Sequence, residues 1–367
     1  MTARRSRLWT AWLAAWRGQE DPRRLAAVRI AIGLVMAWDL ARVARLDLVE
    51  ALWLRSAAGG TIGDLGGEGP LPGVLAWTGA APSAVWALWG ASLVGSLGLA
   101  LGIATRASAV LFALSYAQLG WINPAADRGI DMLVRNVAWV LAFSGSHTVW
   151  SLDAGVARLR GRPFARTIER WPRRLLALQL VVVYWMAGLQ KTGIGWTPMG
   201  DFSALYVVLQ DPSIAAHRFA WLAEVYPLTQ AATLATMIFE WGAPLVLVAW
   251  WYEGTRTRRG WLRAQFNRYP VVLGWLGIGV LLHLGIAATM QLGIFPWAML
   301  ALYPVMLPQG VFARGSTRTN ARDQLPENGV RDGSTQTSAS SSAQEASTMQ
   351  VSSSSKDVRS DSSVHFS

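Results

Sequence analysis

A series of long apolar stretches constrains the fold of this chain more than any other feature of its sequence. A membrane-spanning helix needs about 20 consecutive, mostly apolar residues. Stretches of this kind lie at 25–44, 83–104, 107–122, 131–149, 175–190, 229–251, 271–290 and 292–306. Only 15% of all residues are charged, whereas a soluble domain carries about 25%. We therefore predict an all-α fold, a polytopic transmembrane helical bundle with about eight spans.

The arginines indicate which connections face the cytoplasm, because short cytoplasmic loops are enriched in Lys and Arg. Arginines crowd the segment before the first stretch and the connections at 150–174 and 252–270, and Arg106 lies in the turn at 105–106. Acidic residues predominate in the connections between these. We therefore expect both termini on the cytoplasmic side of the membrane, which is the cytoplasmic (inner) membrane if the chain is bacterial. The net charge of +11 then reflects topology, so the lipid bilayer is the expected partner and nucleic acid is not.

The two ends of the chain differ from the apolar domain at 25–308. Residues 1–24 place Leu and Trp on one helical face with arginines around them, which is typical of a basic amphipathic arm in the headgroup layer; a frayed terminus is the alternative. Residues 309–367 are rich in Ser, Thr and Gln and offer too little apolar area to offset the entropy of ordering, so we expect a disordered polar cytoplasmic tail. The chain has no cysteine, and we expect no bound metal.

Ionisable residues inside apolar stretches are costly in a bilayer, which makes each one a candidate for function. Arg29 lies near the cytoplasmic end of the first stretch, where its side chain is expected to snorkel toward the headgroups. Asp39 with Arg42, and Asp131 with Arg135, have the spacing of ion pairs on one helix. For these four residues we expect structural pairs.

Three further ionisable residues are the candidates for catalysis. Glu240 lies near the middle of the sixth stretch and His283 lies in the seventh, and for each a structural contact with a neighbouring helix is the alternative. Lys191 follows the fifth stretch, and it and Lys356 are the only lysines among 33 basic residues. Lysine can lose its proton when desolvated and arginine effectively cannot, so a retained Lys191 indicates a general base. An interfacial anchor is the alternative for Lys191.

Three strings carry a resemblance to a known family. They are Tyr-Trp-Met-Ala-Gly-Leu-Gln-Lys at 184–191, Trp-Ser-Leu-Asp at 150–153, and His283 followed by Gly-Ile-Phe-Pro-Trp at 293–297. In this order the strings resemble the membrane domain of vitamin K-dependent gamma-glutamyl carboxylase and its bacterial relatives, the horizontally transferred transmembrane (HTTM) domain proteins. The chain departs from the carboxylase at Ile130, where the carboxylase has a histidine, and at Ile286 and Ala288, where it has asparagine and glutamine. We also expect no counterpart of its large soluble C-terminal domain, which engages protein substrates.

The resemblance implies a membrane-embedded, carboxylase-like enzyme that acts on a quinol, with a reduced naphthoquinone as cofactor. Lys191 would be its general base, supported by His283 and Glu240. The same resemblance places Tyr184, Gln190 and Trp297 around the quinone. The alternative is a non-enzymatic accessory protein for the maturation or export of a secreted peptide, since HTTM proteins of that kind exist; its protein partner is unknown. A transporter is less favoured, because the sequence shows neither inverted repeats nor clearly broken helices.

Overall fold

The computed structural model describes Thr10, Leu13 and residues 16–54, 59–60, 75–78, 81–308 and 311–312. Over these residues the chain is helical, apart from an isolated bridge and one antiparallel pair of two-residue strands, β1 (Gln19–Glu20) and β2 (Ile168–Glu169). The predicted all-α class is confirmed. Much of the predicted arm at 1–24 and nearly all of the predicted tail at 309–367 lie outside the described residues, and both stay predictions.

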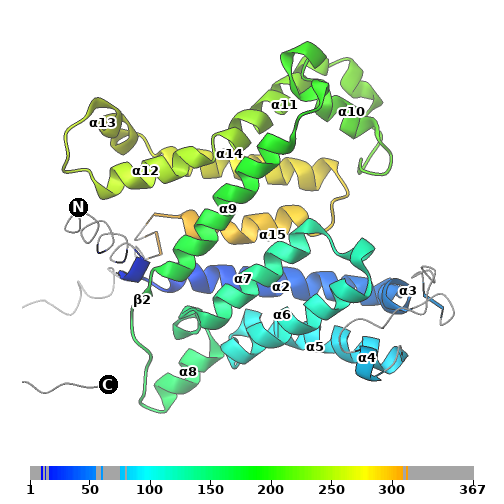
Figure 1. The fold of residues 1–367 in the computed structure, drawn as a ribbon, viewed down its shortest axis with the longest axis vertical. Coiled ribbons are helices and arrows are strands. Elements are labelled where there is room, and N and C mark those ends of the chain that lie inside the picture. Colours follow the sequence, from blue (N-terminus) through cyan, green and yellow to red (C-terminus); the bar gives the residue numbers. More distant parts are fainter. Residues whose placement is uncertain are drawn as a thin grey trace, which may run out of the picture. The chain divides into compact units, whose positions relative to one another are not determined.

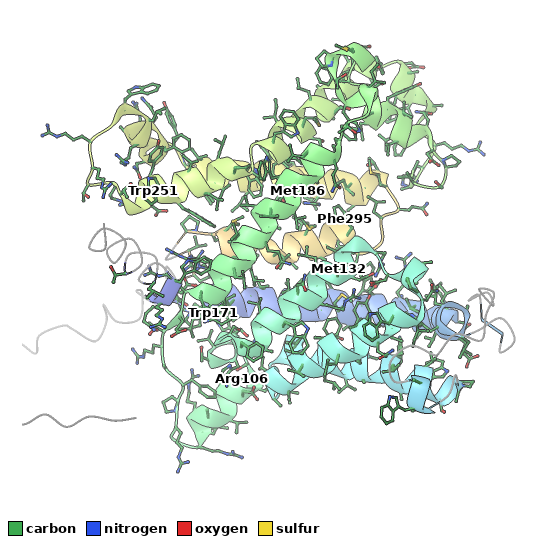
Figure 2. The ribbon with its side chains drawn as sticks, in the orientation of Figure 1. Arg106, Met132, Trp171, Met186, Trp251 and Phe295 are labelled. Carbon is green, nitrogen blue, oxygen red and sulfur yellow. The ribbon has the colours of Figure 1, made fainter. Side chains whose placement is uncertain are left out.

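Every predicted apolar stretch is helical (Figure 1). The helices of the first half are α2 (Arg23–Arg45), α3 (Leu48–Trp53), α4 (Leu75–Thr78), α5 (Pro82–Leu101), α6 (Thr105–Ile122), α7 (Gly129–Phe143) and α8 (Leu152–Leu159). The second half contains α9 (Trp171–Gln190), α10 (Ala204–Gln210), α11 (Tyr226–Trp241), α12 (Pro244–Gly254), α13 (Trp261–Arg268), α14 (Val271–Thr289) and α15 (Phe295–Leu302). Figure 2 labels the first residues of α9 and α15, Trp171 and Phe295. Short 3-10 helices include η4 (Ile194–Trp196), η5 (Pro198–Gly200) and η7 (Tyr303–Met306).

Two helices of the described part are individually long and apolar enough to cross a membrane, and these are α5 and α14. Helices α11 and α12 meet the same requirement as one bent pair. The other predicted spans are present as helices in α2, α6, α7, α9 and α15. The count of eight spans and the cytoplasmic position of both ends therefore stay predictions.

The sixth apolar stretch is not the single helix that its composition predicts. Helix α11 ends at Trp241 and α12 begins at Pro244, and the two axes are bent by 48°. Proline has no N–H and its ring clashes with the carbonyl four residues earlier, which here is that of Glu240. The Glu240 carbonyl instead accepts a hydrogen bond from the Ala243 N–H at 3.2 Å. The predicted sixth span is therefore a bent pair of helices, and the break directly follows a candidate catalytic residue.

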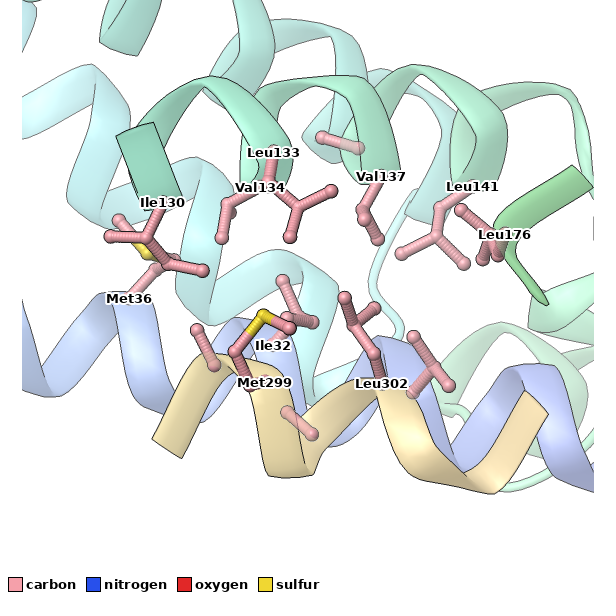
Figure 3. Packing of buried hydrophobic residues seen from close by; sticks show 14 of the residues in the cluster. Ile32, Met36, Ile130, Leu133, Val134, Val137, Leu141, Leu176, Met299 and Leu302 are labelled. Atoms are coloured by element: carbon pink, nitrogen blue, oxygen red, sulfur yellow. The ribbon is translucent and has the colours of Figure 1, made fainter. Parts of the chain in front are cut away.

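Helix α2 lies at the centre of the core and packs against α5, α7 and α15. Figure 3 shows the contact region, in which Ile32 of α2 lies between Val134 of α7 and Leu302 of α15. All three side chains are buried. On the α5 side the backbones approach so closely that a Cβ at Gly33 would lie 2.5 Å from the Ala100 nitrogen. In a bilayer the lipid tails are as apolar as the helices, so the hydrophobic effect does not bring helices together. Close packing of backbones at small residues does so instead.

Arg29 does not snorkel. Its side chain is fully buried, and the guanidinium donates hydrogen bonds to the backbone carbonyls of Leu99, Ala100 and Trp150. The last four carbonyls of an α-helix lack the N–H partner that a further turn would supply, and at the end of α5 the Leu99 carbonyl accepts a bond from the Gly102 N–H as well. An arginine with five donors in a planar fork satisfies them, and this explains why the snorkelling prediction is wrong.

The predicted pairs Asp39 with Arg42 and Asp131 with Arg135 are also wrong. Both carboxylates bind Arg128, at 2.6 Å from Asp39 and 2.8 Å from Asp131. The guanidinium of Arg135 binds Asp127 at 2.6 Å instead, and that of Arg42 lies over the Trp38 ring. Arg128 immediately precedes α7, so its fork reaches a carboxylate on α2 and one on its own helix at once. The Asp39–Arg128 pair joins two helices, which spacing along one helix does not report, whereas Asp131 pairs locally with Arg128 three residues before it.

Candidate functional site

Lys191 and Glu240 form an ion pair. The Lys191 Nζ lies 2.7 Å from each carboxylate oxygen of Glu240, and the side chains are 21% and 8% exposed. Lys191 directly follows α9, and Glu240 belongs to the last turn of α11. The ammonium also lies 5.1 Å from the centre of the Trp196 ring, a position in which the ring face attracts a cation. The structure thus brings together two residues that were singled out separately.

Gly188 allows this pairing. A Cβ at Gly188 would lie 2.4 Å from Trp241 Cδ1 and 3.1 Å from Glu240 Cβ, so any larger residue would push α11 away from α9. Residues four and three apart share one helix face, which places Tyr184, Gly188 and Lys191 on the same side of α9. Glycine in the middle of that face lets the charged ends meet.

A second polar group is buried beside the ion pair. The Tyr184 hydroxyl lies 2.5 Å from His283 Nε2 and 2.8 Å from the Tyr303 hydroxyl. All three side chains are buried, His283 being 1% exposed. They come from α9, α14 and η7. His283 Nδ1 makes no hydrogen bond within the described part of the chain, so the chain of hydrogen bonds ends in an imidazole nitrogen that is free to bind something else.

Aromatic rings enclose this tyrosine–histidine–tyrosine chain. Phe239 and Trp275 stack with their ring centres 4.6 Å apart, and Trp275 Nε1 donates to the Phe239 carbonyl. The Phe295 ring packs edge-on against His283. Gly279 makes room for the Tyr303 hydroxyl, because a Cβ there would lie 2.1 Å from that oxygen. The enclosure keeps the hydroxyls and the imidazole in an apolar surrounding, where hydrogen bonds are stronger than in water.

The two groups adjoin through α9 and α11. Phe239, the neighbour of Glu240, packs edge-on against Tyr184 with ring centres 4.8 Å apart. Among the described residues no hydrogen bond joins His283 to Lys191 or to Glu240. The site therefore consists of an acid–base pair at the ends of two helices and a deeper hydrogen-bonded chain on the same helix faces.

The sequence of the chain matches the HTTM domain family over residues 18–310. The chain belongs to the HTTM domain family. No solved structure matches it. The matched range contains the ion pair, the tyrosine–histidine–tyrosine chain and the apolar helices, and this HTTM protein is accordingly a membrane protein.

The residues expected around a quinone are not gathered in one place in the HTTM domain. Tyr184 is part of the buried chain, whereas Gln190 at the end of α9 is exposed and Trp297 on α15 is 42% exposed. Among the described residues no group of three or more His, Asp or Glu side chains is placed to hold a metal ion. Of the three quinone-binding candidates, Tyr184 is hydrogen-bonded to another candidate residue, His283.

The Trp-Ser-Leu-Asp string of the HTTM domain has a structural role. The Ser151 side chain accepts a hydrogen bond from the Ala154 N–H at the start of α8. The Asp153 carboxylate accepts hydrogen bonds from the N–H groups of Ala104 and Thr105 and from the Thr105 hydroxyl. Asp153 thus caps α6, and the string fixes α8 to the turn between α5 and α6.

Sequence reasoning missed Tyr303, Phe239 and Trp275, together with Gly279, which makes room for Tyr303, and Gly188, which makes room for Glu240. A signal existed for Tyr303, because a tyrosine inside an apolar stretch needs a partner for its hydroxyl. No comparable signal marks Gly188 and Gly279 among the 35 glycines of the chain, because their role depends on which side chain faces them.

Proposed function

We propose that this HTTM protein is a membrane-embedded, carboxylase-like enzyme that acts on a quinol, with Lys191 as the general base. The observation that supports this most is the Lys191–Glu240 ion pair, formed at 2.7 Å between the ends of two predominantly apolar helices. Charges in such surroundings are costly to keep. A purely structural pair could be replaced by apolar residues at little cost in stability, so its presence favours a chemical use.

The pair can generate a base without any change of net charge. Glu240 takes a proton from the Lys191 ammonium, which leaves a neutral amine beside a neutral carboxylic acid. Surroundings of low polarity disfavour the charged forms, so the neutral pair is easier to reach here than it would be in water. The Nζ lone pair then accepts a proton from an acidic hydroxyl presented to it. Arginine in place of Lys191 would hold its proton throughout.

The buried tyrosine–histidine–tyrosine chain can position a ligand and move protons. The Tyr184 hydroxyl can pass a proton between His283 Nε2 and the Tyr303 hydroxyl, and the unpartnered His283 Nδ1 can bind a ligand oxygen. These donors and acceptors fit the oxygens of a reduced naphthoquinone, with His283 and Tyr184 as the groups that would hold it. Such a quinol, when bound, supplies the acidic hydroxyl and the electrons for reaction with oxygen.

We further propose that the membrane is the cytoplasmic membrane of a bacterium, crossed about eight times with both termini inside. The alternation of arginine-rich and acidic connections supports this orientation. In that orientation Lys191 lies toward the outer face, at the end of α9.

Oxygen uptake by the purified protein tests the proposed function. Protein in detergent should release a naphthoquinone on solvent extraction, and addition of the reduced naphthoquinone should start oxygen consumption above that of the quinol with empty detergent micelles. An extract without quinone, together with no uptake above that control, would contradict the proposal.

A peptide-directed accessory role is the second candidate, and one surface feature favours it. The connection between α9 and α11 exposes apolar side chains at Ile194, Met199 and Trp221, with Met199 90% exposed. Such a surface suits an extended apolar peptide or the membrane interface. This role needs no proton transfer, so Lys191→Arg would leave it intact while it abolished the enzymatic one.

A further inference from the structure

A shallow groove with a volume of about 780 Å³ lies between α6 and α7, away from the Lys191 site. Its walls are apolar, formed by Val110, Leu111 and Leu114 of α6 and by Phe143 at the end of α7. Leu114 and Phe143 are 56% and 69% exposed. Arg106, labelled in Figure 2, is in the first turn of α6 and lines the same groove.

The groove is apolar along its length and positively charged at one end. Ala107, Leu111 and Leu114 recur at the spacing of one helix face, which makes an apolar track of about 10 Å at 1.5 Å per residue. Arg106 is exposed and makes neither an ion pair nor a side-chain hydrogen bond with any residue in the described part of the chain. The arginine pattern puts this end of α6 at the cytoplasmic headgroup layer.

We propose that this groove binds an anionic phospholipid, with one acyl chain along α6 and the phosphate on Arg106. A guanidinium matches a phosphate with two parallel hydrogen bonds, and an unpaired cation attracts a headgroup of net negative charge. A free phosphate would leave the apolar track uncovered, and a zwitterionic lipid would bring no net charge to Arg106. The proposal does not depend on the chemistry of Lys191.

Lipid retention measured by native mass spectrometry tests this site. The probes are phosphatidylglycerol and phosphatidylcholine added in equal amounts to the purified full-length protein. The wild type should retain phosphatidylglycerol preferentially, and Arg106→Gln should weaken that binding about fivefold, the effect of one basic residue near an anionic surface. Arg158→Gln removes an equally exposed arginine from α8 outside the groove, so it should change nothing.

A groove-filling variant separates the acyl contact from the headgroup contact. Ala107→Phe keeps Arg106 but occupies the track, and it should reduce the retention of both lipids. Because residues 106 and 107 are exposed, both variants should keep the thermal unfolding temperature of the wild type. An Arg106→Gln protein with unchanged lipid preference would overturn the proposal. So would displacement of phosphatidylglycerol by inorganic phosphate alone, since that would show a site for the headgroup only.

Discussion

Gly188 controls, at the scale of single residues, whether Lys191 can reach Glu240. Gly188→Ala places a methyl group 2.4 Å from Trp241 and 3.1 Å from the Glu240 Cβ, which forces α11 outward. We expect a loss of about 1–3 kcal/mol in the free energy of unfolding and a lower rate of quinol-dependent oxygen uptake. Thermal unfolding in detergent and oxygen consumption measure the two effects.

Gly274→Ala is the matched control for this change. A Cβ at Gly274 on α14 meets nothing within 4 Å, so the same substitution should leave activity unchanged and stability equal or slightly higher. If Gly188→Ala behaves like Gly274→Ala in both measurements, close packing of α9 on α11 is not what holds the ion pair.

The candidate residues could be recognised from the sequence, but their partners could not. An ionisable residue in an apolar stretch is visible by inspection, and this identified Lys191, Glu240 and His283. The partners of Lys191 and His283 lie 49 and 99 residues away, on other helices. Spacing along one helix reports only local neighbours, and for that reason the local pair expected for Asp39 was wrong; Asp131 does pair locally, but with Arg128 rather than with Arg135.

Helix ends, at the scale of whole elements, provide the surroundings of Lys191. Lys191 follows the end of α9 and binds a side chain in the last turn of α11. Both helix C-termini carry partial negative charge, which favours a cation between them. The break at Gly242 and Ala243 creates the second of these ends, so a continuous sixth helix would not provide the same surroundings for Lys191.

The cap that Asp153 provides for α6 should depend on pH. Burial raises the pKa of Asp153, but the hydrogen bonds from Thr105 and Ala104 outweigh it, and the pKa lies below its ordinary value of 3.8. A lowered carboxylate pKa contributes stability that is present above the unfolded pKa and lost as the pH falls through the folded pKa. Asp153→Asn should therefore cost about 1 kcal/mol at pH 7.

Thermal unfolding of the wild type and of Asp153→Asn across pH 7 to 3 checks this prediction. The difference between the two unfolding temperatures should narrow once the pH falls below about 4. A difference of constant size over the whole range would show that the ionised carboxylate is not what caps α6.

Helix positions in this chain could largely be predicted from the length of the apolar stretches, but length alone does not report an interruption within a stretch. Each apolar stretch is long enough to bury a helix, and each one forms helix. The division at 242–243 was missed although Gly, Ala and Pro follow one another there, because an apolar run of 23 residues at 229–251 was counted by length alone. Proline inside a helical pattern is a local signal, and at this position it was the better guide.

Orientation in the membrane is the prediction that belongs to the whole molecule. Because the chain has no cysteine, single replacements report position without background. Gly155→Cys in α8 and Ala264→Cys in α13 should resist an impermeant thiol reagent in intact cells, whereas Met199→Cys in η5 should react. Gly155, Met199 and Ala264 are exposed. A cysteine that does not react is therefore shielded from the reagent by the membrane and not by burial in the protein. The opposite labelling pattern would invert the proposed topology.

The proposed enzymatic function depends on proton release by Lys191, and quinol-dependent oxygen consumption by Lys191→Arg is its most direct test. Arginine keeps the charge and can still pair with Glu240, but it does not give up its proton near neutral pH. Lys356→Arg is the matched control, because it makes the same chemical change at the other lysine of the chain. We expect wild-type folding for both variants and a loss of activity of about 100-fold or more in Lys191→Arg alone. Equal activity in the two variants would contradict the proposed enzymatic function.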